Sequence, residues 1–428
     1  MSEQCDIGDS LSLLRSKKLH DLQNVREKNR NAVLAQNRML STEVKSDVSF
    51  SQVKDLLLDL KDKSKKLDKQ TLTRIKNSCC HAEFIESFFK INGVFNALLS
   101  CLKHNDAQIQ LEAVACLTNL ACGPHKLCFR IAKSAGPYLV LFMTGSSHYL
   151  QAQCAWAIRN IANDCETCYF RLKSQGVFPT LLKILVSPIP DVIEPAIYAL
   201  SACLKHGDLD LIDENGEKYS NGLLKLIEEH RFPIPTLQEA AFALANSFYI
   251  AVKANSDFEN FDIQKVLECL KTFVYQDSDE CLVTLQLIRC LGYLTSSEFV
   301  TEKLINCVQF HEITIKLLNH PFHFLKKELL WVLTNISVSQ VIDNNHALFL
   351  PILKVLETFL NTLDSASLPA LYYVCCTAKG NENICSLYQQ YGVVSNIQNL
   401  MASDNTILKN SSATCLAIIQ KPDSSPYE

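Results

Sequence analysis

A segment of nine residues recurs along this chain at a nearly constant spacing. Clear copies read EAVACLTNL at 112–120, QCAWAIRNI at 153–161, EAAFALANS at 239–247 and ELLWVLTNI at 328–336. With weaker copies included, the anchor residues, meaning those aligned with Asn119, are Asn77, Asn119, Asn160, Ala202, Asn246, Tyr293, Asn335, Cys376 and Ile418. Two residues before them stand Ile75, Leu117, Ile158, Leu200, Leu244, Leu291, Leu333, Val374 and Leu416. Because the anchors are 41 to 47 residues apart, the sequence predicts a stack of similar units.

A column of glycines supports this repeat. Gly93, Gly136, Gly176 and Gly392 each follow an anchor by 16 or 17 residues and suit a helix-ending turn with positive φ. Apolar residues at i, i+3 and i+4 around them predict helices, so each unit reads as helix, glycine turn, helix, helix. One such unit cannot bury its apolar faces alone. The period is that of armadillo and HEAT arrays. We therefore expect an all-α, right-handed superhelical solenoid of about nine armadillo-type repeats with a concave groove.

The repeats define the expected organisation of the chain. The solenoid is expected at 50–420, after an N-terminal arm at 1–45 and before a disordered tail at 421–428 that carries two prolines. The two longest spacings imply insertions. Asp208–Ser220 is polar and contains Asn-Gly, and we expect it and Ala254–Phe261 to be exposed loops.

Composition excludes several other classes. The 12 glycines and 13 prolines are few for 428 residues, which disfavours loop-rich α/β enzymes and β-sandwiches. There is no apolar run long enough to span a membrane, and the polar N-terminus does not resemble a signal peptide. No glycine-rich phosphate loop, HExxH or GxSxG is present. We expect a protein that is not an enzyme, uses no cofactor and does not insert into a membrane.

The 19 cysteines read as reduced thiols that pack like small hydrophobic side chains. Cys165 and Cys168 have the spacing of a redox motif or of half a zinc site, but no second CxxC lies nearby in the sequence. We therefore expect no metal site, and we expect the cytoplasm and nucleus as compartments.

Two copies of the repeat carry a family resemblance. WAIRNIAND at 156–164 and WVLTNI at 331–336 resemble the Trp-x-x-x-Asn signature of importin-α proteins, and the resemblance extends over about residues 60–420. It implies that these residues line a groove that reads nuclear localisation signals. Trp and Asn four residues apart share one helix face. The Asn amide offers a donor and an acceptor to a peptide backbone, and the Trp ring attracts Lys or Arg. The alternative is that the Trp packs in the core and the Asn bridges two repeats.

The expected peptide-binding groove comprises Asn119, Trp156, Asn160, Asp164, Tyr198, Phe242, Asn246, Trp331, Asn335 and Tyr372. Asp164, one turn beyond Asn160, is expected to accept the ammonium charge of a bound lysine. The sequence also departs from the family pattern, since only two anchors retain their Trp. Anchors Ala202 and Cys376 cannot clamp a peptide backbone. Arg289, in the Trp column, would repel a basic ligand if it faces the groove.

The arm is charged oppositely to the rest of the chain. Arg15–Lys45 holds eight Lys or Arg and three Asp or Glu, net +5, in a chain of net −4. In placement and character it resembles the importin-β-binding segment of importin-α, although without its dense basic runs. The carrier-binding residues would be Arg15, Lys17, Lys18, Arg26, Lys28, Arg30 and Arg38. Three interpretations stay open: a helix that binds a carrier such as importin-β, an autoinhibitory strand, and a solvated helix.

These observations lead to two functional hypotheses. The first is an importin-α-like adaptor that binds extended cargo peptides, of the nuclear localisation signal type, for nuclear protein import. The second is an armadillo scaffold or chaperone that binds a non-basic protein partner. Nucleic-acid binding is disfavoured because the body of the chain is acidic and only the arm is basic.

Overall fold

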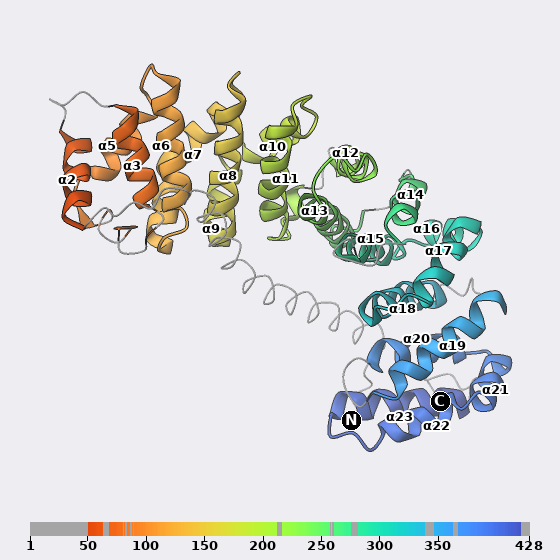
Figure 1. The fold of residues 1–428 in the computed structure, drawn as a ribbon. Helices are drawn as coiled ribbons and strands as arrows, with labels where there is room; N and C mark the ends of the chain where they lie inside the picture. Colours follow the sequence, from red (N-terminus) through yellow and green to blue (C-terminus); the bar gives the residue numbers. More distant parts are fainter. Residues whose placement is uncertain are drawn as a thin grey trace. The chain divides into compact units, whose positions relative to one another are not determined.

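The computed structural model describes residues 50–62, 68–79, scattered positions between 81 and 90, 91–211, 216–274 apart from 257, 259 and 260, 281–338, 346–362 and 367–420. Every regular element in these ranges is a helix (Figure 1). The expected all-α class is therefore confirmed. The arm at 1–45 and the tail at 421–428 lie outside the described residues.

The chain divides into two compact units, 1–203 and 204–428. The first unit holds α2 (Phe50–Lys61), α3 (Lys69–Ser78), α5 (Val94–Cys101), α6 (Ala107–Leu120), α7 (His125–Met143), α8 (His148–Asp164), α9 (Glu166–Lys173), α10 (Val177–Leu185) and all but the last residue of α11 (Pro190–Leu204). No described helix is long and apolar enough to span a bilayer.

The second unit is built in the same way. It holds a short 3₁₀ turn, η1 (Leu209–Leu211), followed by α12 (Gly216–Glu228), α13 (Ile234–Lys253), α14 (Ile263–Phe273), α15 (Cys281–Leu294), α16 (Glu298–Ile305), α17 (Val308–Leu318), α18 (His323–Val338), α19 (His346–Leu360), α20 (Leu368–Ala378), α21 (Glu382–Gln390), α22 (Val393–Leu400) and α23 (Thr406–Gln420).

The anchor residues all lie on one set of helices, which we call the anchor row. In the first unit α3 packs on α6 and α6 on α8. In the second unit α13, α15, α18, α20 and α23 pack on one another in that order (Figure 1). Eight of the nine aliphatics that precede the anchors are at most 3% exposed, while Leu416 on α23 is partly exposed. The aliphatic column is therefore the buried seam that joins successive repeats.

Aspartate caps start several of these helices. Asp68 accepts a hydrogen bond from the backbone N–H of Thr71 at 2.7 Å before α3, and Asp106 accepts one from Gln108 at 2.8 Å before α6. Each satisfies a donor that the first helical turn leaves without an intrahelical partner. These caps fix where α3 and α6 begin, while α8 and α13 begin without a side-chain cap.

The glycine column is confirmed at three of its four positions. Gly93, Gly176 and Gly392 have φ of 89°, 85° and 74° and stand directly before α5, α10 and α22. The turn expected at Gly136 is wrong, because α7 runs unbroken through it. A Cβ there would lie 1.9 Å from Oε1 of Gln175, so this glycine allows a close approach between segments of two repeats.

Several described residues of the two expected loops are helical or buried. Within Asp208–Ser220, helix α12 already begins at Gly216, and Ser220 is buried. Within Ala254–Phe261, Phe258 and Phe261 are buried and pack edge-on against Phe248. The polar residues around Phe258 and Phe261 concealed these two apolar contacts from sequence reasoning. The contacts hold this connection against α13.

Candidate functional site

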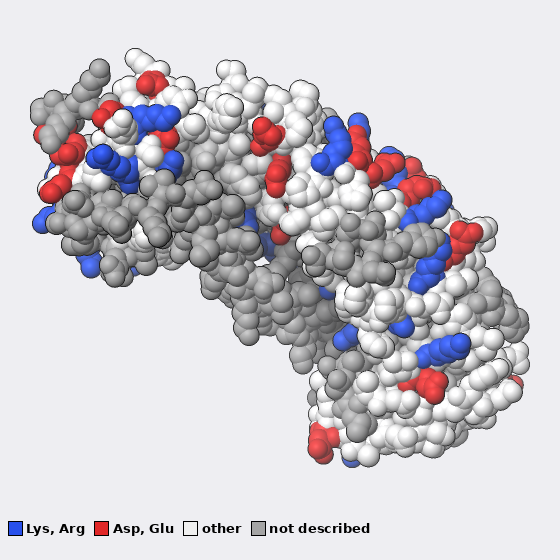
Figure 2. Space-filling view, viewed as in Figure 1, with Lys and Arg blue, Asp and Glu red and all other residues white. Residues whose placement is uncertain are grey.

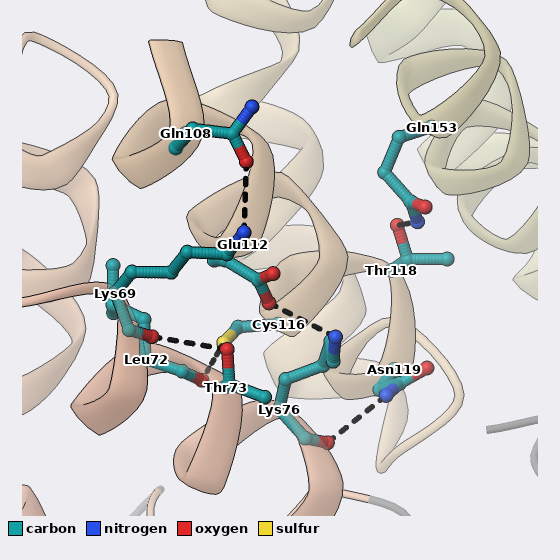
Figure 3. A network of polar contacts seen from close by, with 10 residues as sticks. All are labelled: Lys69, Leu72, Thr73, Lys76, Gln108, Glu112, Cys116, Thr118, Asn119 and Gln153. Carbon is teal, nitrogen blue, oxygen red and sulfur yellow. Dashed lines mark hydrogen bonds and ion pairs between the residues drawn. The ribbon is translucent and has the colours of Figure 1, made fainter. Parts of the chain in front are cut away.

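The anchor asparagines bind the backbone of the preceding repeat. Nδ2 of Asn119 donates to the carbonyl of Lys76 at 3.1 Å (Figure 3). Asn160 donates to Thr118 at 3.0 Å, and Asn335 donates to Gly292 at 2.8 Å. Each bond spans 42 or 43 residues of sequence and joins two neighbouring helices of the anchor row. Each of these amides therefore already donates at least one hydrogen bond inside the protein.

At Asn160 the amide oxygen, which is the acceptor, differs from the nitrogen in its contacts. Its Oδ1 is buried and has no hydrogen-bond partner among the described residues, and the residue is 7% exposed. Asn246 is similarly buried, and its Nδ2 has no partner there either. A peptide that reached Asn160 would find one acceptor. A clamp by both halves of the amide, as expected from the sequence, would use Oδ1 and the second N–H of Nδ2, because one N–H already bonds Thr118.

An aromatic pair lies beside Asn160 in the first unit. The rings of Trp156 on α8 and Tyr198 on α11 are 5.2 Å apart and half-buried. The guanidinium of Arg159 stacks on both, with Cζ 5.5 Å from the Trp156 ring and 5.1 Å from the Tyr198 ring. Arg159 is only 7% exposed. The chain's own arginine therefore occupies the position that a lysine or arginine of a ligand would take on these rings.

A second aromatic pair lies beside Asn335 in the second unit. The rings of Trp331 on α18 and Tyr372 on α20 are 5.8 Å apart. Trp331 is half-buried and Tyr372 is 6% exposed. The position that carries Arg159 in the first pair carries Thr334 here, whose hydroxyl donates to the carbonyl of Leu330. The residue three positions after the Trp is therefore cationic in the first pair and uncharged in the second.

Arg289 does not present an isolated positive charge. Its Nη2 lies 3.1 Å from Oε1 of Glu328, and both side chains are about one-tenth exposed. Glu328 is the first residue of its copy of the repeat. Glu112 has the same place in an earlier copy and pairs with Lys76 at 2.9 Å (Figure 3). The repulsion considered from the sequence is therefore offset by an acidic residue that the repeat itself supplies.

Asp164 is also engaged within the protein. Its Oδ2 lies 2.6 Å from Nδ1 of His125 and 3.4 Å from Sγ of Cys168. This carboxylate therefore has two neighbours that a bound lysine would have to displace. Neither contact follows from the spacing of Asp164 and Asn160.

Sequence reasoning missed some residues of the anchor row. Tyr249 and Tyr293 form a third aromatic pair, 5.6 Å apart, and the ammonium of Lys253 lies 4.8 Å from the Tyr249 ring. Burial raises the pKa of the Tyr293 phenol, which keeps it a neutral hydroxyl. Phe242, named from the sequence, is half-buried on α13. A search three residues beyond each anchor would have found Tyr249, and one three residues beyond each Trp would have found Arg159.

The surface offers no single region of strong charge on the face that is visible. The Lys, Arg, Asp and Glu side chains seen there are intermixed in both units (Figure 2). The seven basic residues expected to bind a carrier lie in the arm, outside the described residues. The aromatic pairs and their asparagines are therefore the groups of the anchor row whose residue types suit peptide binding.

Comparison with known proteins supports the repeat assignment. A model of the armadillo/beta-catenin-like repeat matches residues 91–122, which contain α5 and α6. Importin subunit alpha-9 of Arabidopsis thaliana is 27% identical over 263 residues, which are 58% of this chain and 49% of the relative. Importin subunit alpha-1b of Oryza sativa subsp. japonica is 26% identical over 193 residues, 44% of this chain and 34% of the relative. The chain thus matches about half or less of the length of these relatives.

The fold comparison agrees with the sequence comparison. The crystal structure of an engineered protein matches 90% of this chain and 98% of its own length, with a TM-score of 0.68 and 20% identity. At that identity the likeness concerns the fold alone. The repeat match, the relatives and the helical architecture together show that the chain is built of armadillo-type repeats and is similar in sequence to importin subunit alpha proteins.

Proposed function

We propose that this protein is a binding scaffold, not an enzyme, that holds extended peptides along its anchor row. The observation that carries the proposal is the recurrence of one arrangement in both units. In each, a Trp, an aromatic residue of the next repeat and an anchor Asn come together, at Trp156, Tyr198 and Asn160 and again at Trp331, Tyr372 and Asn335. Aromatic faces hold cations and the aliphatic stems that carry them.

The two pairs differ in what they can bind. The second-unit pair, beside Thr334, suits a lysine or arginine of a ligand. The first-unit pair already holds the guanidinium of Arg159. We therefore propose that a basic residue of a peptide is read beside Thr334 in the second unit. Taken by itself, the first unit offers a peptide the Oδ1 of Asn160, which has no hydrogen-bond partner among the described residues.

We further propose that the peptides are cargo segments of the nuclear localisation signal type and that the protein acts in the cytoplasm and nucleus. The support is the similarity to importin subunit alpha proteins. In this proposal the basic arm recruits importin-β, as its resemblance to the importin-β-binding segment suggests.

A direct test measures the binding of a fluorescent Lys-rich peptide to the full chain by anisotropy. We expect Trp331→Ala to weaken binding about 2- to 30-fold, the range that corresponds to a cation–π contact of about 0.5–2 kcal/mol. Phe299→Ala is the matched control, because Phe299 is an exposed aromatic residue of the same unit that lies on α16, off the anchor row. Equal affinities for the two variants would contradict the proposal.

Two further measurements separate the alternatives. A charge-driven complex weakens as salt rises, so the titration is repeated across a salt series with the Lys-rich peptide and with a Ser-substituted peptide. If the uncharged peptide binds as well at every salt concentration, the scaffold or chaperone hypothesis for a non-basic partner is favoured instead.

The arm is tested in the full chain with Arg26→Glu, Lys28→Glu and Arg30→Glu combined. A carrier-binding arm predicts loss of importin-β binding with unchanged affinity for the Lys-rich peptide. An autoinhibitory arm predicts tighter peptide binding, because the arm no longer competes. If neither measurement changes, the arm is a solvated helix.

A further inference from the structure

Four side chains with metal-binding atoms converge in the first unit. They are His125 at the start of α7, Asp164 at the end of α8, and Cys165 and Cys168 at the start of α9. One ligand atom from each lies within 4.8 Å of all the others. Among the described residues this is the one group of three or more such side chains that close together. Cys165 and Cys168 have the spacing of half a zinc site, and the sequence shows no second CxxC near them.

The contacts within the cluster are specific. Nδ1 of His125 lies 2.6 Å from Oδ2 of Asp164, and Sγ of Cys168 lies 3.4 Å from the same oxygen. The side chain of His125 is 57% exposed and Cys165 is half-buried, while Cys168 is fully buried. The cluster therefore has two ligands fixed in the core and two at the surface, where an ion can reach them.

We propose that His125, Asp164, Cys165 and Cys168 form a tetrahedral zinc site. Two thiolates, one imidazole and one carboxylate are all ligands that Zn²⁺ accepts, and four protein ligands are typical of a structural zinc site. The expectation from the sequence that this chain has no metal site is thereby revised. The other two ligands are a histidine 40 residues before Cys165 and the aspartate that directly precedes Cys165.

The size of the cluster suits zinc. With zinc–sulfur bonds of about 2.3 Å and zinc–nitrogen or zinc–oxygen bonds of about 2.0 Å, tetrahedral ligand atoms are about 3.3–3.8 Å apart. The sulfur of Cys168 is already 3.4 Å from Oδ2 of Asp164. The pair of His125 and Asp164 must open by about 0.7 Å, because zinc takes the place of the proton between them. The exposed imidazole can move for this, and the longest separation in the cluster, up to 4.8 Å, must close by about 1 Å.

The four ligands determine which protons are released when zinc binds and what net charge the site carries. Both cysteines lose their thiol proton to water when the ion binds. His125 binds through Nδ1 and keeps its remaining proton on Nε2, which its exposure leaves open to water. With Asp164 ionised, the two positive charges of zinc face three negative ligands, so the site carries a net charge of −1.

The surroundings of the sulfurs support a metal-bound thiolate. The backbone N–H of Cys168 donates to Sγ of Cys165 at 3.3 Å, and the hydroxyl of Thr167 lies 2.9 Å from the same sulfur. Such donors stabilise a metal-bound thiolate from outside the ligand shell.

A bound ion would connect three helices of the first unit. His125 belongs to α7, Asp164 ends α8 and both cysteines begin α9. The site would therefore fix the end of α8, the helix that carries Trp156 and Asn160. It would also keep Asp164 from acting as the acceptor for a ligand's ammonium group.

The test uses the full chain, reduced and stripped of metal, then loaded with Zn²⁺ or Co²⁺ and freed of excess ion. We expect about one zinc per chain by mass spectrometry of the metal. The cobalt form should show the visible bands of tetrahedral Co²⁺ and a near-ultraviolet thiolate charge-transfer band. Cys165→Ser and His125→Ala should each lower zinc affinity by more than about 100-fold, the upper limit for loss of an outer-shell partner.

The controls use equivalent residues elsewhere in the chain. Cys307 is also half-buried and also precedes a helix, α17, and His148 is an exposed histidine at the start of α8, so Cys307→Ser and His148→Ala should bind zinc as the wild type does. Zinc should raise the melting temperature of the wild type and both controls, but of neither ligand variant. No bound metal in the wild type would overturn the proposal, as would binding that survives in both ligand variants. If Cys165→Ser loses zinc binding but His125→Ala does not, the assignment of His125 as a zinc ligand is overturned.

Discussion

Replacing Arg159 tests whether the chain blocks one of its own cation-binding positions. The change Arg159→Thr copies Thr334, the residue at the equivalent place beside Trp331 and Tyr372. It removes the guanidinium that now lies 5.5 and 5.1 Å from the centroids of the Trp156 and Tyr198 rings. We expect the variant to bind a Lys-rich peptide more tightly than the wild type does.

The magnitude follows from the burial of the two rings. A cation on an aromatic face contributes about 0.5–1 kcal/mol when exposed and about 2 kcal/mol when desolvated. Trp156 and Tyr198 are half-buried, so we expect about 1–2 kcal/mol, or roughly 5- to 30-fold in Kd. In the wild type a lysine must displace Arg159 and gains little from the same rings.

The assay is anisotropy of the labelled peptide at constant salt. Arg130→Thr is the matched control, because Arg130 stacks on Phe95 at 4.3 Å elsewhere in the same unit, so both variants lose one positive charge and one ring contact. Adding Trp156→Ala to Arg159→Thr should remove the gain. The reasoning would be refuted if the two arginine variants bound the peptide equally, because the effect would then be one of net charge.

Three further predictions concern the stability of the repeats. Arg289→Met should lower the free energy of unfolding by about 3 kcal/mol in urea titrations, because it removes the guanidinium that pairs with the nearly buried carboxylate of Glu328. Adding Glu328→Leu should recover most of this loss, and a double variant no more stable than the single one would contradict the assignment. Gly176→Ala should cost about 1–2 kcal/mol, because residue 176 has φ of 85° and a Cβ strains that conformation, so an unchanged melting temperature in calorimetry would argue against it. Asp68→Ala should cost about 1 kcal/mol at neutral pH through loss of the cap on α3. The backbone hydrogen bond from Thr71 lowers the pKa of Asp68 in the folded state, so the difference from wild type should disappear as pH falls through that lowered pKa. A difference that persists in acid would show that another contact is responsible.

The repeat was predictable because it depends on periodicity. The aliphatic column from Ile75 onward and the glycines before α5, α10 and α22 lie where the sequence indicates. Gly136 was not predictable, because its small size serves a contact with Gln175, which is distant in sequence. The buried Phe258 and Phe261 were hidden in the same way by the polar residues around them.

The candidate site was predictable only in its residue types. Trp156, Asn160, Trp331 and Asn335 stand out from their spacing. What they contact depends on the neighbouring repeat. The sequence left open whether each Asn clamps a peptide or bridges two repeats, and at Asn119, Asn160 and Asn335 the amide donates a bridging hydrogen bond to the preceding helix. The position of Arg159 on two rings from different helices could not be read from one helix alone.

By itself, the sequence determined the helices, their period and the seam that joins them, since these depend on residues a few positions apart or on one repeating pattern. Tertiary structure alone decided which side chains are already engaged. Repeats that stack bring together residues about 40 positions apart, such as Arg289 with Glu328 and His125 with Asp164. No local pattern encodes those pairs, because each partner is chosen by the helix against which its own helix packs.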